Sequence, residues 1–154
     1  MNRRALIVCI GNELVADDGV GRAIYERLRA QPLPDRVRLV FLGLGGIDLL
    51  EELAGEELLV VVDGVQLGGE AGTVHRLGWE QLPPTPPRPV SGHGIGIREA
   101  IGVGRILYPE RMPQEIHLIG IEGSCFNELG GGLTEAVARA VPRAVAAIVN
   151  LLQS

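Results

Sequence analysis

The chain has 154 residues, the size of one ordinary domain, and it is long enough to bury a substantial hydrophobic core. Its hydrophobic content is 46%, its charged content is 21% and its net charge is −5, so a globular fold is expected rather than a disordered chain. All 14 basic residues are arginines, which excludes mechanisms that need lysine, such as a P-loop, a Schiff base or a Ser–Lys dyad.

The distribution of charge and apolar residues excludes two kinds of partner. No basic stripe suited to nucleic acid is present, and no uninterrupted apolar stretch reaches the roughly 18 residues of a membrane span. The first apolar run stops at Gly11, too early for the core of a signal peptide. We therefore expect a cytoplasmic protein that binds neither nucleic acid nor membrane.

Strands and helices alternate along the first half of the chain. The apolar segment 5–10 predicts a buried strand, and apolar residues at helical spacing then predict a helix from Gly19 to about Ala30. A second strand is expected at 37–42, a short helix near 47–53, and a third, wholly apolar strand at 58–62. The alternating segment 73–77 predicts a shorter strand, and its tight connection to the preceding strand suggests antiparallel pairing at a sheet edge.

The same alternation continues after a proline-rich loop at 83–89. A helix is expected from Ile95 to about Leu107, then a last strand at 116–121, and Thr134 can cap a final helix. This order predicts a single domain over residues 1–154. Its fold class is a three-layer α/β/α sandwich with a mostly parallel twisted sheet of about five strands.

Several polar residues lie at the ends of apolar strands or at the starts of helices, and they are the candidates for an active or metal-binding site. Asp17 and Asp18 follow the first strand, Asp63 follows the third, and His93 precedes the third long helix. Because the carboxyl ends of parallel strands share one edge of a sheet, Asp18 and Asp63 are expected to meet there, with His93 on a loop that closes over them. One imidazole and two carboxylates suit Zn, Ni, Mn or Fe, and three protein ligands leave coordination positions open.

Each of these residues also has an ordinary structural interpretation. Asp17 or Asp18 can cap the helix that follows, and Asp63 before Gly64 can be a turn residue. His75 and His117 lie within strands and are expected to be structural, and Cys9 is expected to lie in the core.

The sequence offers three alternatives to a metal site: a serine nucleophile, a cysteine nucleophile and dinucleotide binding. Ser91, His93 and Asp63 could form a hydrolytic triad, but no serine lies in a G-x-S-x-G turn. Cys125 paired with His93 is a weaker nucleophile candidate. Dinucleotide binding is disfavoured because the segment after the first strand lacks the G-x-G-x-x-G spacing and its two aspartates would repel a pyrophosphate.

The motifs resemble those of the [NiFe]-hydrogenase maturation endopeptidases. The opening signature of that family is similar to Gly11-Asn12-Glu13-Leu14-Val15-Ala16-Asp17-Asp18-Gly19-Val20-Gly21. Five further blocks agree in order: Val61–Gly64, Gly69–Thr73, Ser91–His93, Ile119–Glu122 and Gly131–Thr134. The resemblance covers nearly the whole chain; one departure is Gly94, where members of the family often carry Gln.

The resemblance implies a function and a set of site residues. It implies that Asp18, Asp63 and His93 are both the metal-binding and the catalytic positions, and that nickel arrives with the substrate, with Zn or Cd able to substitute. The implied activity is removal of the C-terminal extension from the precursor of a [NiFe]-hydrogenase large subunit after nickel insertion. A catalytically silent relative that acts as a metal-dependent chaperone of hydrogenase assembly is the second class left open, and the three intact residues favour the protease.

Overall fold

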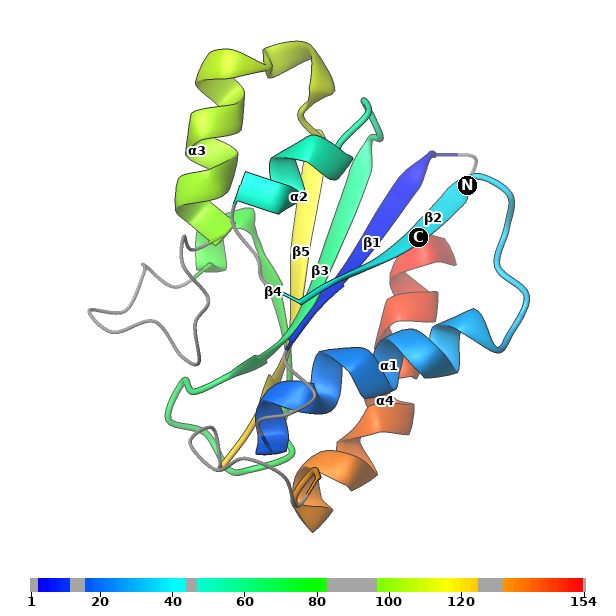
Figure 1. Cartoon of the computed structure of the whole chain (residues 1–154), viewed down its shortest axis with the longest axis vertical. Helices are drawn as coiled ribbons and strands as arrows, with labels where there is room; N and C mark the ends of the chain where they lie inside the picture. Colours follow the sequence, from blue (N-terminus) through cyan, green and yellow to red (C-terminus); the bar gives the residue numbers. More distant parts are fainter. Residues whose placement is uncertain (1–2, 12–15, 44–46, 83–96, 125–131, 154) are drawn as a thin grey trace.

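The computed structural model describes residues 3–11, 16–43, 47–82, 97–124 and 132–153. They form one five-stranded sheet that is covered by helices on both faces (Figure 1). The strands are β1 (Ala5–Ile10), β2 (Val37–Leu42), β3 (Leu58–Val65), β4 (Val74–Gly78) and β5 (Glu115–Glu122). The helices are α1 (Val20–Arg29), α2 (Ile47–Glu52), α3 (Ile97–Leu107) and α4 (Glu135–Gln153).

The sheet is parallel except at one edge. Its strand order is β2-β1-β3-β5-β4, and β1 pairs in parallel with both β2 and β3. β3 pairs in parallel with β5 along its whole length, whereas β4 runs antiparallel to β5. The predicted fold class is therefore confirmed. β4 is an antiparallel edge strand as expected, but its neighbour is β5 and not the preceding strand, because β5 already occupies that side of β3.

The continuous apolar runs in the sequence are explained by burial on both faces of the sheet. Ile7 and Cys9 of β1 pack on the face covered by α1 and α4, and the alternate residues Leu6 and Val8 pack on the face covered by α2 and α3. Figure 1 shows this three-layer arrangement, with α1 and α4 on one side of the strands and α2 and α3 on the other.

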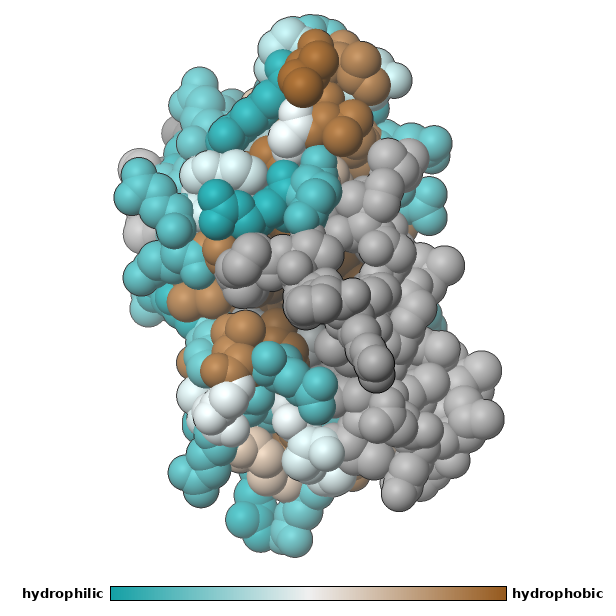
Figure 2. Space-filling model, turned by 90° about the vertical axis from the view of Figure 1, so that its left-hand side faces the viewer, coloured by the Kyte–Doolittle hydropathy of each residue, from teal (hydrophilic) through white to brown (hydrophobic). Residues whose placement is uncertain are grey.

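The two ends of the sheet differ in character. At the end where β5 begins, exposed apolar side chains gather at the end of α3, namely Ile106, Leu107 and Tyr108, and Figure 2 shows apolar surface at that end of the molecule. At the other end lie the carboxyl termini of β1, β3 and β5 together with the start of α1 (Figure 1). No helix within the described ranges is long and apolar enough to cross a membrane.

Candidate active site

Two glycines bring the acidic segment close to the end of β1. Between β1 and α1 the chain forms a one-turn 3-10 helix, η1 (Ala16–Gly19), which contains both aspartates of the opening motif. A Cβ atom on residue 11 would lie 2.3 Å from the carbonyl oxygen of Asp18, and one on residue 21 would lie 2.0 Å from the carbonyl oxygen of Ile10. Gly11 and Gly21 are therefore required for η1 and α1 to sit directly on the end of β1.

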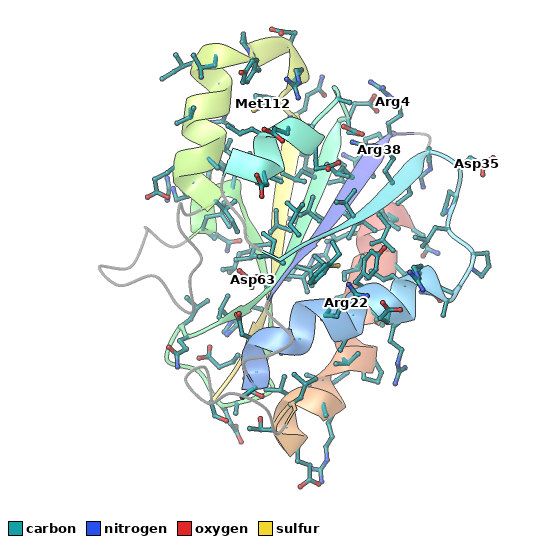
Figure 3. All side chains as sticks on the ribbon, viewed as in Figure 1. Arg4, Arg22, Asp35, Arg38, Asp63 and Met112 are labelled. Carbon is teal, nitrogen blue, oxygen red and sulfur yellow. The ribbon has the colours of Figure 1, made fainter. Side chains whose placement is uncertain are left out.

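Buried carboxylates concentrate at this edge of the sheet. Asp17 and Asp18 are completely buried, Asp63 is 8% exposed and Glu122 is 3% exposed. Asp63 belongs to β3, beside which η1 lies, and Figure 3 shows it low on the central strands, at the level of α1. A buried carboxylate is unfavourable unless donors or cations compensate it, so this concentration marks the edge as a polar site in an otherwise apolar sheet.

The carboxylate of Asp63 affects the pKa of a cysteine in the neighbouring strand, β1. Cys9 of β1 is completely buried, and burial, reinforced by the nearby Asp63 carboxylate, raises the pKa of the Cys9 thiol far above its usual range. Cys9 therefore stays a neutral thiol and acts as a core residue, as expected, and not as a nucleophile.

The position of Asp17 differs from the expected helix cap. The residue before α1 is Gly19, and no side-chain hydrogen bond caps that helix. The Asp17 carboxylate instead accepts hydrogen bonds from the backbone N–H groups of Ser124 at 2.9 Å and of Thr134 at 2.8 Å. The cap expectation was wrong because the carboxylate has partners that are distant in the sequence and are brought close only by the fold.

The sequence did not predict a pair formed by a partly buried histidine and a buried glutamate at this edge. Nε2 of His75 in β4 lies 2.9 Å from Oε1 of Glu122, the last residue of β5. The N–H of Leu67 also donates to both oxygens of Glu122, at 3.1 and 3.0 Å. A signal was available, because Ile121-Glu122-Gly123 repeats the pattern of an apolar strand followed by an acid and a glycine that singled out Asp63.

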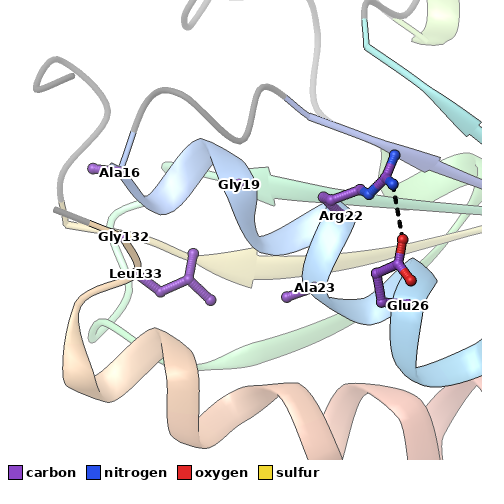
Figure 4. A pocket seen from close by; sticks show the side chains of 7 residues that line it. All are labelled: Ala16, Gly19, Arg22, Ala23, Glu26, Gly132 and Leu133. Atoms are coloured by element: carbon purple, nitrogen blue, oxygen red, sulfur yellow. Dashed lines mark ion pairs between the residues drawn. The ribbon is translucent and has the colours of Figure 1, made fainter. Parts of the chain in front are cut away.

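A cavity of about 330 Å³ lies beside η1, on the side of α1 and α4 (Figure 4). It is lined by Ala16, Gly19, Arg22, Ala23, Glu26, Gly132 and Leu133. Its two charged lining residues are Arg22 and Glu26, which pair with each other at 2.8 Å. The cavity is therefore mainly apolar, and neither Asp18 nor Asp63 lines it.

The remaining predicted residues, His93, Ser91 and Cys125, lie outside the described ranges. Within the described ranges, no three side chains of histidine, cysteine, aspartate or glutamate are grouped so that they could hold a metal ion. Asp18 and Asp63 therefore occupy the expected edge of the sheet, and their binding of a metal together with His93 stays a prediction.

The fold and the acidic edge define an α/β protein whose candidate site lies at the carboxyl ends of parallel strands, and comparison with known proteins identifies its family. A family model described as hydrogenase maturation protease matches residues 22–151. The chain is 32% identical to the hydrogenase expression/formation protein HupD of Rhizobium leguminosarum, over 98% of this chain and 75% of that protein. It is 30% identical to a putative hydrogenase maturation protease of Methanocaldococcus jannaschii, over 94% of both chains.

The structural comparison agrees with the sequence comparison. The hydrogenase maturating endopeptidase HybD from E. coli has a TM-score of 0.84 and 26% sequence identity, over 97% of this chain and 92% of that one. The chain belongs to the hydrogenase maturation protease family and is an endopeptidase of that class.

Proposed function

We propose that this endopeptidase removes the C-terminal extension of a [NiFe]-hydrogenase large-subunit precursor after nickel has been inserted. The observation that carries the proposal is the placement of two buried carboxylates, Asp18 and Asp63, at one edge of the sheet in a chain of this family. Nickel is part of the substrate in this proposal, and Zn or Cd is expected to substitute for it in binding experiments.

The chemistry of the donor set supports recognition of a metal that is shared with the substrate. Two carboxylates and the imidazole of His93 supply at most three side chains, so the coordination sphere is completed by groups of the precursor. Carboxylates that are already buried lose little further hydration when the precursor closes over them. Binding of nickel by the protein alone is therefore expected to be weak, and binding to the nickel-loaded precursor strong.

The experiment is incubation of the protein with a nickel-loaded, unprocessed large subunit, followed by mass measurement of the products. Hydrolysis of one peptide bond consumes one water, so the shortened subunit and the released peptide together must have the mass of the precursor plus one water. The matched control is the same precursor without nickel, which is expected to remain intact. Cleavage at the same rate with and without nickel would contradict metal recognition, and stable binding without cleavage would favour the chaperone.

A further inference from the structure

The carboxylate of Asp17 joins three segments that are far apart in the sequence. Oδ2 accepts hydrogen bonds from the N–H of Ser124 at 2.9 Å and from its hydroxyl at 3.3 Å. Oδ1 accepts from the N–H of Thr134 at 2.8 Å, and the Thr134 hydroxyl lies 3.0 Å from both oxygens. Asp17 is completely buried, so these donors compensate a charge that would otherwise be costly to bury.

The two donor residues hold the ends of different elements. Ser124 comes two residues after the end of β5, and Thr134 immediately precedes α4. The Thr134 carbonyl also accepts a hydrogen bond from the N–H of Ala138 at 2.9 Å, which belongs to the first turn of that helix. Asp17 thus fastens the end of β5 and the beginning of α4 to η1, the turn that also carries Asp18.

The backbone around Asp18 is constrained from two directions. On one side, Gly11 approaches so closely that a Cβ there would lie 2.3 Å from the Asp18 carbonyl oxygen. On the other side, the hydrogen bonds of Asp17 fix the preceding residue. Ala16 has a φ of +25°, a conformation that L residues adopt only under constraint from their surroundings. With η1 held in this way, the direction of the Asp18 side chain depends on the contacts of its neighbour.

We infer that Asp17 is a positioning residue for the proteolytic reaction. It holds η1, the turn that carries Asp18, in place beside β3, and it does not itself contact metal or substrate. The two aspartates of the motif then have different roles: Asp17 bonds to the protein and Asp18 acts at the site. This inference rests on the proposed function, because it acts through Asp18.

The first test compares Asp17→Asn with Glu56→Gln in cleavage of the nickel-loaded precursor. Glu56 is also a buried carboxylate that accepts side-chain and backbone hydrogen bonds, but it lies just before β3, at the opposite end of the sheet. With both variants fully folded, Asp17→Asn is expected to lower kcat/KM at least about tenfold, whereas Glu56→Gln changes it less than about twofold. Equal kcat/KM in the two folded variants would overturn the inference.

The second test asks whether Asp17 acts through Asp18. In a double-mutant cycle, Asp17→Asn is expected to have less than about a twofold effect when Asp18→Asn is already present, because a positioning residue has nothing left to position. A contribution to folding alone would add its full effect in either background. If Asp18→Asn cleaves at the wild-type rate, the proposed function itself fails; if it loses cleavage while Asp17→Asn keeps it, only the present inference fails.

A third pair of variants keeps the inference testable if Asp17→Asn does not fold. Thr134→Val removes the hydroxyl that contacts Asp17 but keeps the backbone N–H, and it is expected to lower kcat/KM about three- to tenfold. Thr134→Ser keeps the hydroxyl and is expected to stay within about twofold of the wild-type protein. Wild-type kcat/KM in folded Thr134→Val would contradict the positioning role.

Discussion

Nε2 of His75 lies 2.9 Å from Oε1 of Glu122, which links β4 to the end of β5 at the edge of the sheet where Asp63 lies. The same carboxylate accepts the N–H of Leu67, so it also fixes the turn between β3 and β4. β5 begins with a similar pair, in which Nε2 of His117 lies 2.7 Å from Oε2 of Glu115. The two pairs differ in exposure, since the glutamate side chain is 4% exposed in the first and 43% exposed in the second, and Glu115 is also paired with Arg3 at 2.8 Å.

This difference in exposure predicts a difference in stability. Glu122→Ala removes a buried carboxylate that accepts hydrogen bonds from the Leu67 N–H and contacts His75, and it is expected to lower the free energy of unfolding by about 1–3 kcal/mol. Glu115→Ala removes two partly exposed, solvent-screened ion pairs, with His117 and with Arg3, and is expected to cost about 1 kcal/mol or less. Urea unfolding of both variants measures the comparison. Equal losses would show that burial of Glu122 adds nothing to the strength of its contacts.

The pH dependence of stability is expected to depend in part on Glu56. Burial alone would raise the pKa of Glu56, but hydrogen bonds from Arg38 and from backbone N–H groups outweigh it and hold the pKa below its usual range. Because the pKa is lower in the folded state, the carboxylate stabilises the fold fully above its unfolded pKa of about 4.5. The contribution is then lost as the pH falls through the lower, folded pKa.

Unfolding by urea at a series of pH values tests this role of Glu56. In Glu56→Gln, the free energy of unfolding is expected to be lower at neutral pH and to fall less steeply than in the wild-type protein as the solution is acidified below about pH 5. Arg38→Gln serves as the matched control, because it removes the partner and leaves the acid. Parallel curves for wild type and Glu56→Gln would show that the pKa of this carboxyl is the same in both states.

The sequence predicted the parts of the fold that depend on local patterns. β1 and β2 have the predicted bounds. β1 is an uninterrupted apolar segment, which is typical of a strand buried on both faces, whereas β2 contains Arg38 and is a partly exposed edge strand. The partner of β4 could not be predicted in the same way, since local pattern does not determine which strand inserts between two others. The choice of β5 over β3 depends on pairing between segments that are distant along the chain.

The candidate site shows the same limit. Asp18 and Asp63 could be placed at one edge from the order of strands alone, because parallel strands end on the same side. The contacts of Asp17 with Ser124 and Thr134 could not be predicted, because an aspartate before a helix has the same local pattern whether it caps that helix or bonds to a distant segment. His75 and Glu122 likewise become partners only through the antiparallel pairing of β4 and β5.

Close packing of α1 on β1 predicts opposite effects for two glycine substitutions. In Gly21→Ala the new Cβ would lie 2.0 Å from the Ile10 carbonyl oxygen, so α1 must shift and the free energy of unfolding is expected to fall by about 1–3 kcal/mol or more. Gly102 lies inside α3, and within the described ranges such a Cβ would have no atom within 4 Å apart from its chain neighbours and the backbone of its own helix. Gly102→Ala is therefore expected to stabilise the protein by about 0.5–1 kcal/mol.

Thermal or urea unfolding of the two glycine variants measures both effects in one protein. If Gly21→Ala also moves η1, its loss of cleavage activity is expected to exceed the loss explained by its unfolded fraction. A Gly21→Ala variant as stable as the wild type would show that α1 does not lie directly on the end of β1.

Asp63 gives the sharpest distinction between a structural turn residue and a residue of the proposed site. Asp63→Asn keeps the shape of the side chain and one oxygen acceptor but removes the charge. A turn residue would tolerate this change, whereas loss of a carboxylate that recognises nickel in the precursor is expected to lower cleavage at least about 100-fold.

His93→Ala is expected to abolish cleavage in the same assay. Ser91→Ala and Cys125→Ala are the matched controls and are expected to cleave almost normally, because neither residue has the sequence context of a nucleophile. Each variant is incubated with the nickel-loaded precursor and followed by mass spectrometry, with circular dichroism as a check on folding. Full activity of Asp63→Asn together with loss of activity in Ser91→Ala would contradict the metal-recognition site and favour a serine hydrolase in which Ser91 is the nucleophile and the Asp63 carboxylate is not required.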